Sequence, residues 1–397
     1  MKDLKHLIYF EHLLDEAANE LVMQAVSEGK HAVGYTCYHM PEVLLNLDNC
    51  FSVRMRAPRT GSLEISTYYM TNYLCGYAKA LVERGIEGGY NFLSAMLSSE
   101  TCQMMHRAHE YFDIMGLVKE QNPDFFLSMM DVPFVTTKAA YEHYENQLRK
   151  HILEPLEKVC GVDISDKAIR AAIEEHNDIC GIISELGELR KLPNPPITSY
   201  EFHVLQLVSE CCPQYLIKDK LLETLKEVRK RKVDPKPNYR ARLVVTGSEV
   251  DDPVFTKLLE DCGVYVVADR YCFGSFPSRE QIEIKEGETA FDAICRHYLY
   301  WNQCARFMDG FKIDQRHAIA AQLVEDFKAD GIIYENMKFC EFWSYEKVLA
   351  NHIFTNEKHI PCCTIEKEYS LGAVGQLRTR FQAFIESLEI KSIQGGK

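Results

Sequence analysis

The feature that most constrains the fold of this chain is an alternation of strands and helices that occurs twice, once in each half. In the first half, a strand-like stretch over residues 31–40 runs into Pro41-Glu42, and proline is favoured at the first position of a helix. In the second half, the apolar stretch 241–247 ends in a glycine turn, and Asp252 is a candidate N-cap for the helix that follows. Such alternation predicts parallel sheets, whose ligands bind beyond the carboxyl ends of the strands.

The stretch between the two units is helical almost throughout, and it ends in the linker Asp234-Pro-Lys-Pro-Asn238. We therefore predict an α/β protein with two parallel-sheet, flavodoxin-like domains and a helical segment between them. The expected division is an N-terminal α/β domain with a leading helix over 1–137, a helical segment and linker over 138–238, and a C-terminal α/β domain over 239–397. Local patterns further predict one helix over 5–28, a helix over 64–84 that contains Cys75, a strand over 91–97 and a closing strand over 134–137.

Charge and hydropathy exclude several classes of partner. The net charge of −13 argues against a nucleic-acid or anionic-membrane surface, which requires a basic footprint. No apolar run approaches the roughly 18 residues of a membrane span, and the first residues lack the apolar core of a secretory leader. We therefore expect a cytoplasmic protein with no membrane and no nucleic-acid partner.

The chain contains 15 cysteines, which a reducing cytoplasm would keep from forming a disulfide framework. No CxxC or HExxH pair is present, so any metal site must be assembled from distant segments. Cys102 and Cys340 each follow a predicted strand at the start of a helix, where a thiolate is favoured. Cys37 and Cys272 also lie just beyond strands, whereas Cys362 and Cys363 lie inside an apolar strand and are expected in the core. For each single cysteine, the alternative is a plain buried residue.

Segments spread over nearly the whole chain resemble those of one protein family. By the order of these segments and the placement of three cysteines, the chain resembles the 2-hydroxyacyl-CoA dehydratase family, which includes benzoyl-CoA reductase subunits. The matching segments are 34–45 with Pro41-Glu42, 74–90, the strand leading to Cys102, 243–247, 266–269, 330–333, 337–340 and 377–381.

The resemblance implies that Cys75, Cys102 and Cys340 ligate a 4Fe-4S cluster with one iron open to a non-protein ligand. It further implies a homologous second subunit, in a heterodimer or homodimer, and a separate ATP-dependent activator that delivers one low-potential electron. The implied reaction dehydrates a 2-hydroxyacyl-CoA to the 2-enoyl-CoA through a ketyl radical. This chain has no GxxxxGK[ST] motif, so ATP use is expected elsewhere. Gln103 stands where relatives often have Asp, and Glu341 follows Cys340.

Two alternative functions remain open. The first is an ATP-dependent reductase, either of the benzoyl-CoA reductase type or with a double-cubane 8Fe cluster on three further cysteines, Cys37, Cys272 and Cys304. The second is a non-catalytic subunit that relays electrons or supports its neighbour. Catalytic residues other than cluster ligands are not identified by the sequence.

Three further groups have both a functional and a structural interpretation. His106 and His109 share a helical face after Cys102, and they either transfer protons near the cluster or are simply packed. Glu42 is either an acid or base, or a first-turn residue that complements the helix dipole. The third group is Arg378, Thr379 and Arg380. These residues either contact CoA phosphates or simply lie on a surface helix.

Overall fold

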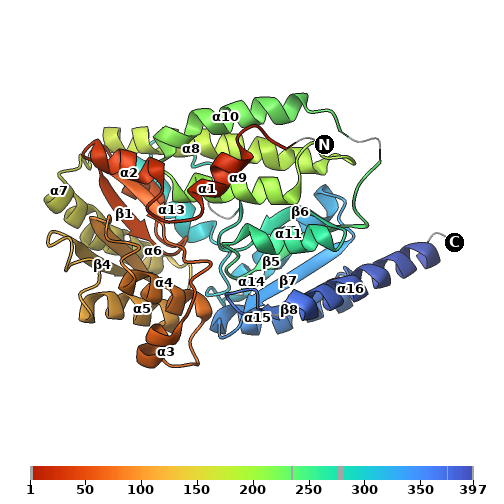
Figure 1. Ribbon diagram of the computed structural model, residues 1–397. Helices are drawn as coiled ribbons and strands as arrows, with labels where there is room; N and C mark the ends of the chain where they lie inside the picture. Colours follow the sequence, from red (N-terminus) through yellow and green to blue (C-terminus); the bar gives the residue numbers. More distant parts are fainter. Residues whose placement is uncertain (1–2, 234–235, 276–279, 373, 396–397) are drawn as a thin grey trace.

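The computed structural model describes residues 3–233, 236–275, 280–372 and 374–395, and two parallel four-stranded sheets form its framework (Figure 1). The strand order is β2-β1-β3-β4 in the first sheet and β6-β5-β7-β8 in the second. Both orders follow the flavodoxin-like pattern, which confirms the predicted fold class. The strands are β1 (His31–Tyr35), β2 (Cys50–Arg54), β3 (Ala95–Glu100), β4 (Phe126–Asp131), β5 (Ala241–Gly247), β6 (Val264–Arg270), β7 (Gly331–Met337) and β8 (Cys362–Lys367).

The central strands are buried on both faces because helices cover each side of the sheets. All seven residues of the central strand β7 are buried, and so are all five of β2, although β2 lies at the edge of the first sheet. Gly247 ends β5 at a φ of 146°, and a Cβ there would lie 1.8 Å from the carbonyl oxygen of Glu335. Only glycine permits this close approach, which turns the chain out of the sheet at its carboxyl edge.

The first sheet is covered by short helices from its own half of the chain. The α4 and α5 helices pack against each other, and α2 packs against β1. These helices and turns are α1 (Leu7–Leu13), α2 (Glu20–Ser27), η1 (Glu42–Leu45), α3 (Glu64–Met70), α4 (Gly76–Ile86) and α5 (Gln103–Ile114).

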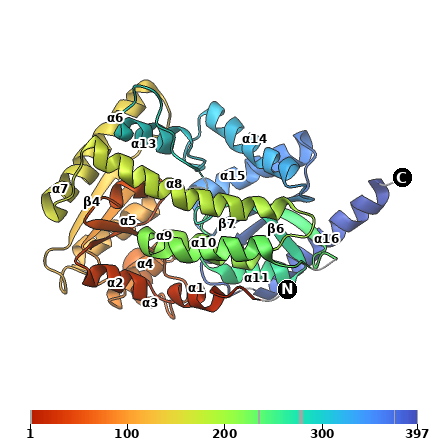
Figure 2. The same ribbon diagram turned by 90° about the horizontal axis from the view of Figure 1, so that it is seen from above.

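A layer of long helices joins the two sheets. The α8, α9 and α10 helices run side by side along one face of the molecule, over both halves (Figures 1 and 2). In particular, α9 packs against both β2 and β6. The helical segments are α6 (Lys138–Leu148), η2 (Arg149–Leu153), α7 (Glu154–Cys160), α8 (Asp166–Glu188), η3 (Leu189–Lys191), α9 (Ser199–Cys211) and α10 (Gln214–Lys230).

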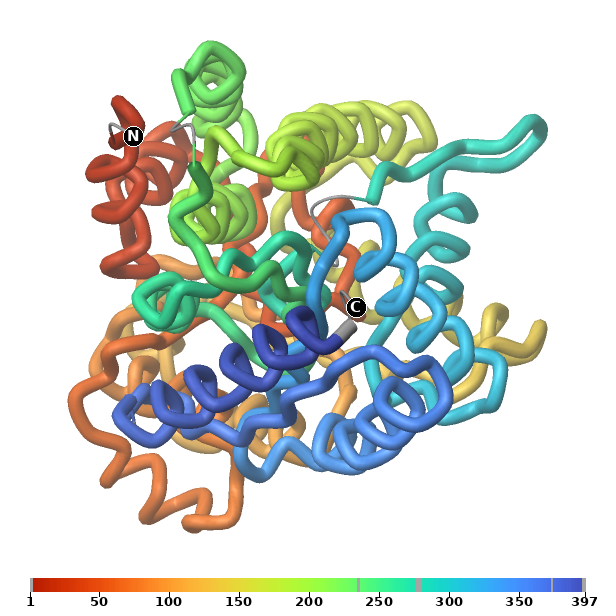
Figure 3. Tube along the Cα trace, turned by 90° about the vertical axis from the view of Figure 1, so that its right-hand side faces the viewer, coloured from red at the N-terminus to blue at the C-terminus, as the bar shows by residue number. Residues whose placement is uncertain are grey.

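The second sheet has its own helices, and the last of them extends beyond the body of the molecule. This helix, α16, packs beside α11 and β8, and it lies at the front in Figure 3. The helices are α11 (Pro253–Asp261), α13 (Ala290–Tyr300), α14 (Gly310–Asp326), α15 (Glu341–His352), η4 (Ile353–Glu357) and α16 (Val374–Gly395).

Three local predictions were wrong, and the strand predicted over 91–97 is displaced, because β3 runs from Ala95 to Glu100. The leading helix is two helices, because the Asn19 side chain accepts hydrogen bonds from the backbone of Leu21 and Val22 and starts α2 afresh. The predicted helix 64–84 breaks at Thr71, whose φ of 73° ends α3, and helix resumes only after Cys75. The closing strand is β4, whereas Thr137, at the end of the segment predicted as that strand, is the N-cap of α6.

The apolar cores do not divide cleanly between the halves. One cluster contains Val33 of β1 together with Val244 and Ile332 of the second sheet. The predicted domain boundaries at 137 and 238 therefore stay predictions. None of the helices in the described ranges has both the length and the apolar character needed to cross a bilayer.

Candidate functional site

Three cysteines occupy the same structural position in different parts of the fold. Cys75, Cys102 and Cys340 are the N-cap residues of α4, α5 and α15, each with an extended backbone. We call them the helix-start triad. The structure corrects the expectation that Cys75 lies within a helix. Burial raises the pKa of each thiol, to about 11 for Cys75. Backbone N–H groups of the following helix oppose this rise, from Ala78 and Tyr77 for Cys75, Met105 for Cys102 and Trp343 for Cys340.

Three other cysteines lie in loops. Cys37 is in the turn between β1 and η1, and Cys272 comes two residues after β6, where its N–H donates to the Ser248 carbonyl at 2.9 Å. Cys304 is in the loop between α13 and α14. We call these three residues the loop triad.

The two triads come together. Burial, followed by the thiols of Cys102 and Cys75, raises the pKa of Cys340 well above its usual range. Burial and the neighbouring thiol of Cys75 likewise raise the pKa of Cys102, with a further effect from Cys37. Burial and the Cys37 thiol raise the pKa of Cys304 to about 12. The charge of a neighbouring thiol therefore affects the pKa of each of these three cysteines. Cys37 acts on Cys102, and Cys304 acts on Cys340, so the thiols of the two triads lie near one another.

The six residues differ from the other cysteines in their surroundings. Each of the six thiols lies deep in the protein, and all of these residues except Cys75 are half-buried, whereas Cys75 is buried. Of the remaining nine cysteines, only Cys362 and Cys363 are half-buried, and both pack against apolar clusters beside β8. Five of the six cysteines are therefore deep in the protein without being closed off from solvent.

The donor set fits an iron–sulfur cluster better than a single ion. No three His, Cys, Asp or Glu side chains in the described ranges are close enough to share one metal ion. A tetrahedral ion with metal–sulfur bonds of about 2.3 Å would bring its thiolates within about 4 Å of one another. In a cluster, each thiolate binds a different iron, so wider spacing among buried thiols is what such a cofactor requires.

The strand order explains why the thiols gather here. In flavodoxin-like sheets, the ligand crevice opens where the strand order reverses, between the first and third strands. Cys37 follows β1 and Cys102 follows β3, so both border this crevice in the first sheet. In the second sheet the equivalent strands are β5 and β7, which are followed by Glu249 and Cys340.

Glu249 is the acidic residue of the site. Burial raises its pKa to about 8, with Asp251 and Glu335 adding to the effect against Arg54. Its Oε2 atom is buried without a hydrogen-bond partner. Its charge also acts on the thiol of Cys272. Sequence reasoning missed Glu249, although it follows a buried strand and a glycine turn, which is the rule that selected the cysteines.

Buried cations hold the loop that carries Cys304. Arg306 donates to the Thr101 carbonyl at 2.5 Å and to the Val132 carbonyl, so it ties this loop to the chain beside Cys102. Arg316 donates to the Cys304 carbonyl at 3.3 Å and pairs with Glu346 at 2.9 and 2.7 Å.

Glu346 is the carboxylate that neutralises the charge of Arg316. Its side chain also bonds with His317 at 2.7 Å. Burial alone would raise its pKa, but the His317 hydrogen bond and the Arg316 guanidinium lower the pKa to about 2. Glu346 is therefore ionised throughout the physiological range, and it compensates the charge of Arg316.

The remaining candidates have structural partners. His106 is 3.0 Å from Glu100, and His109 is 3.1 Å from the Ser98 hydroxyl. Glu42 is the first residue of the short helix η1, as the structural interpretation predicted, and it is buried against His176 at 2.7 Å and accepts from Tyr298. In the last helix, the Thr379 hydroxyl donates to the Gly375 carbonyl at 3.0 Å and Arg378 lies 3.9 Å from Asp261. Arg380 lines a small groove whose other charged residues are Lys338, Glu366, Lys367 and Glu368.

Comparison with known proteins finds relatives over nearly the whole chain. The family model of 2-hydroxyglutaryl-CoA dehydratase, D-component, matches residues 37–388. The (R)-phenyllactyl-CoA dehydratase beta subunit of Clostridium sporogenes is 23% identical over 96% of this chain and 97% of that protein. The (R)-2-hydroxyglutaryl-CoA dehydratase beta subunit of Acidaminococcus fermentans is 24% identical over 91% and 93%. A benzoyl-CoA reductase subunit of Thauera aromatica is 21% identical over 82% of each.

Proposed function

The chain belongs to the 2-hydroxyglutaryl-CoA dehydratase D-component family, and on that premise we propose that it is an iron–sulfur subunit that performs one-electron chemistry on an acyl-CoA. The family and the names of the relatives support a 2-hydroxyacyl-CoA dehydratase-like role. The observation that carries the proposal is the gathering of six deep thiols, from both halves of the chain, at the ligand edge of two parallel sheets.

In the dehydratase form of this proposal, Cys75, Cys102 and Cys340 hold a 4Fe-4S cluster. Such a cluster, when bound, supplies a low-potential electron and an iron with an open coordination position. The substrate is a 2-hydroxyacyl-CoA, and the product is the 2-enoyl-CoA. In this proposal a separate ATP-dependent activator delivers the electron, and the sequence itself has no phosphate-binding loop of the GxxxxGK[ST] type. The enzyme is completed by a second, homologous subunit.

The loop triad favours a second candidate, an ATP-dependent reductase. A cluster on three thiols leaves Cys37, Cys272 and Cys304 deep beside it without a role. A double-cubane 8Fe cluster would use all six thiols, three at helix starts and three in loops. The convergence of the two triads therefore supports the larger cofactor more strongly than the smaller one.

Iron and sulfide analysis of the anaerobically purified full-length protein tests both forms. About eight irons per chain would support the double-cubane reductase, and about four would support the dehydratase. A protein without iron after anaerobic reconstitution would overturn the proposal. Turnover with 2-hydroxyacyl-CoAs in the presence of activator and ATP then tests dehydration directly.

A further inference from the structure

Arg54 is a buried cation whose hydrogen bonds the protein leaves incomplete. Its side chain has no exposed surface, and Nη1 bonds with Glu210 at 2.7 Å. Its Nε and Nη2 atoms have no partner, and among the described residues it is the only side chain with two such buried nitrogens. A guanidinium carries five N–H donors, and a buried donor without an acceptor destabilises the fold. An acceptor from outside the polypeptide, such as a cofactor atom or water, would complete these hydrogen bonds.

The position of Arg54 indicates which space that acceptor occupies. Arg54 ends β2, paired in register with Tyr35, and its guanidinium lies 3.8 Å from the centre of the Phe273 ring. Tyr35 is two residues before Cys37, and Phe273 directly follows Cys272. The Arg54 charge also acts to lower the pKa of both of these thiols. The guanidinium thus lies against the residue that follows Cys272, and its charge acts on the thiols of both Cys37 and Cys272.

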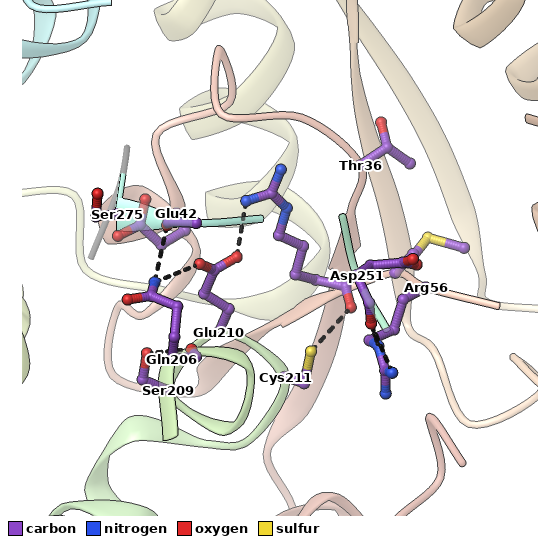
Figure 4. Close-up of polar contacts among 12 residues, drawn as sticks. Thr36, Glu42, Arg56, Gln206, Ser209, Glu210, Cys211, Asp251 and Ser275 are labelled. Carbon is purple, nitrogen blue, oxygen red and sulfur yellow. Dashed lines mark hydrogen bonds and ion pairs between the residues drawn. The ribbon is translucent and has the colours of Figure 1, made fainter. Parts of the chain in front are cut away.

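The ion pair with Glu210 fixes the direction of the guanidinium. Gln206 donates to Glu210 at 2.8 Å and to the Gly274 carbonyl at 2.9 Å, so the carboxylate is held from α9 (Figure 4). Because Glu210 already neutralises the charge of Arg54, the site lacks a hydrogen-bond acceptor and does not lack a counter-ion. The planar guanidinium presents Nε–H and Nη2–H in a rigid fork, which suits one acceptor with several lone pairs.

We propose that Arg54 donates these two hydrogen bonds to an inorganic sulfur of the cluster and thereby raises its reduction potential. The inference rests on the proposed function, because it requires the cluster. Hydrogen bonds to cluster sulfur stabilise the more negative, reduced state, and they are one of the factors that set its potential. Arg54 is accordingly a positioning and tuning residue, distinct from the thiol ligands.

The test compares Arg54→Met and Arg54→Lys with the wild-type full-length protein, loaded anaerobically. Redox titration followed by electron paramagnetic resonance should give a more negative midpoint potential for Arg54→Met at unchanged iron content. Arg54→Lys keeps the charge but loses the fork, so its shift should have the same sign and be smaller. Exchangeable-proton couplings to the reduced cluster, measured in H₂O and D₂O, should weaken in both variants.

Two controls separate tuning from stability. Glu210→Gln removes the counter-charge but leaves the donors, so the potential should stay or become less negative. Arg231→Met breaks another buried ion pair, with Glu201 at 2.8 Å on the α9–α10 side, and should lower the melting temperature without changing the potential.

The possible failures are distinguishable. A wild-type protein that binds no iron overturns the proposed function. An iron-loaded Arg54→Met with the wild-type potential and proton couplings overturns the inference alone, since Arg54 would then be bonded to water. If Arg54→Met does not fold, Arg54→Lys decides between these outcomes.

Discussion

The two cysteine triads reach the same space by different means. The helix-start triad is placed by secondary structure, since each thiol sits where a helix begins and where backbone N–H groups favour a thiolate. The loop triad has no such frame, and buried cations hold its surroundings: Arg316 and Arg306 at the Cys304 loop, and Arg54 beside Cys37 and Cys272. The backbone fold therefore sets the positions of the helix-start triad, whereas the positions of the loop triad depend on a few side chains.

Each triad also draws on both halves of the molecule. Cys75 and Cys102 come from the first sheet's half and Cys340 from the second, while the loop triad takes one residue from the first half and two from the second. A cofactor held by either triad therefore bridges the two sheets. Variants that remove single thiols or their supports should reveal how much each triad contributes.

The largest effect is expected from the helix-start triad. Cys102→Ala removes the thiol at the start of α5, and we expect the protein to lose all of its bound iron. Iron and sulfide counts after anaerobic reconstitution measure this loss. Cys362→Ala, on β8, is the matched control and should retain the full count. Normal iron content in Cys102→Ala would exclude this residue as a ligand.

The loop triad should give a smaller and more informative change. If all six thiols hold a double-cubane cluster, Cys304→Ala should lower the iron content from about eight to about four per chain. The electron paramagnetic resonance spectrum of the reduced protein should change at the same time. A wild-type iron count in this variant would limit the cofactor to the helix-start triad and favour the dehydratase over the reductase.

The support of the loop triad should be visible in stability. Glu346→Gln leaves Arg316 buried without its charge partner, and breaking a buried pair in this way typically costs about 3–5 kcal/mol. Urea unfolding of the metal-free protein measures the change. Glu357→Gln removes the exposed pair with His352 and should cost under about 1 kcal/mol. Equal effects of the two substitutions would contradict the supporting role of Glu346.

Acid should weaken the same support. The folded-state pKa of Glu346 is about 2, below its usual value of 4.5, so the stabilisation is complete above pH 4.5 and is lost as the pH falls toward 2. A shift of this size corresponds to roughly 3 kcal/mol. Stability should therefore fall less steeply between pH 4.5 and 2 in Glu346→Gln than in the wild type. Parallel curves in denaturant titrations at several pH values would argue against this account.

The sequence predicted the sheets and part of the site. Cys102 and Cys340 were placed correctly, because an apolar strand followed by a helix start is a local pattern. Cys75 was misplaced, because nothing in the residue types of 64–84 signals the positive φ of Thr71 that divides the helix. Cys304 has no strand before it, so only tertiary packing brings it to the other thiols.

The burial of Arg54 and its pairing with Glu210 were beyond prediction for a related reason. The alternating pattern of the strand predicts that Arg54 faces outward. In the structure, α9 covers Arg54 and supplies its partner Glu210, which is more than 150 residues away in the sequence. Burial of this kind is decided by which helix covers a sheet face. Such long-range pairing leaves no local trace in the sequence.

The distribution of the thiols along the chain has a consequence for biosynthesis. During synthesis, Cys37, Cys75 and Cys102 emerge from the ribosome early. Cys272 and Cys304 emerge much later, and Cys340 is among the last parts of the fold to emerge. Because domains generally fold from the N-terminus as the chain is made, the first sheet can form while its cysteines still lack their counterparts. Loading of a cofactor that needs both halves must then wait until translation is nearly finished, and a prematurely terminated chain would expose reactive thiols.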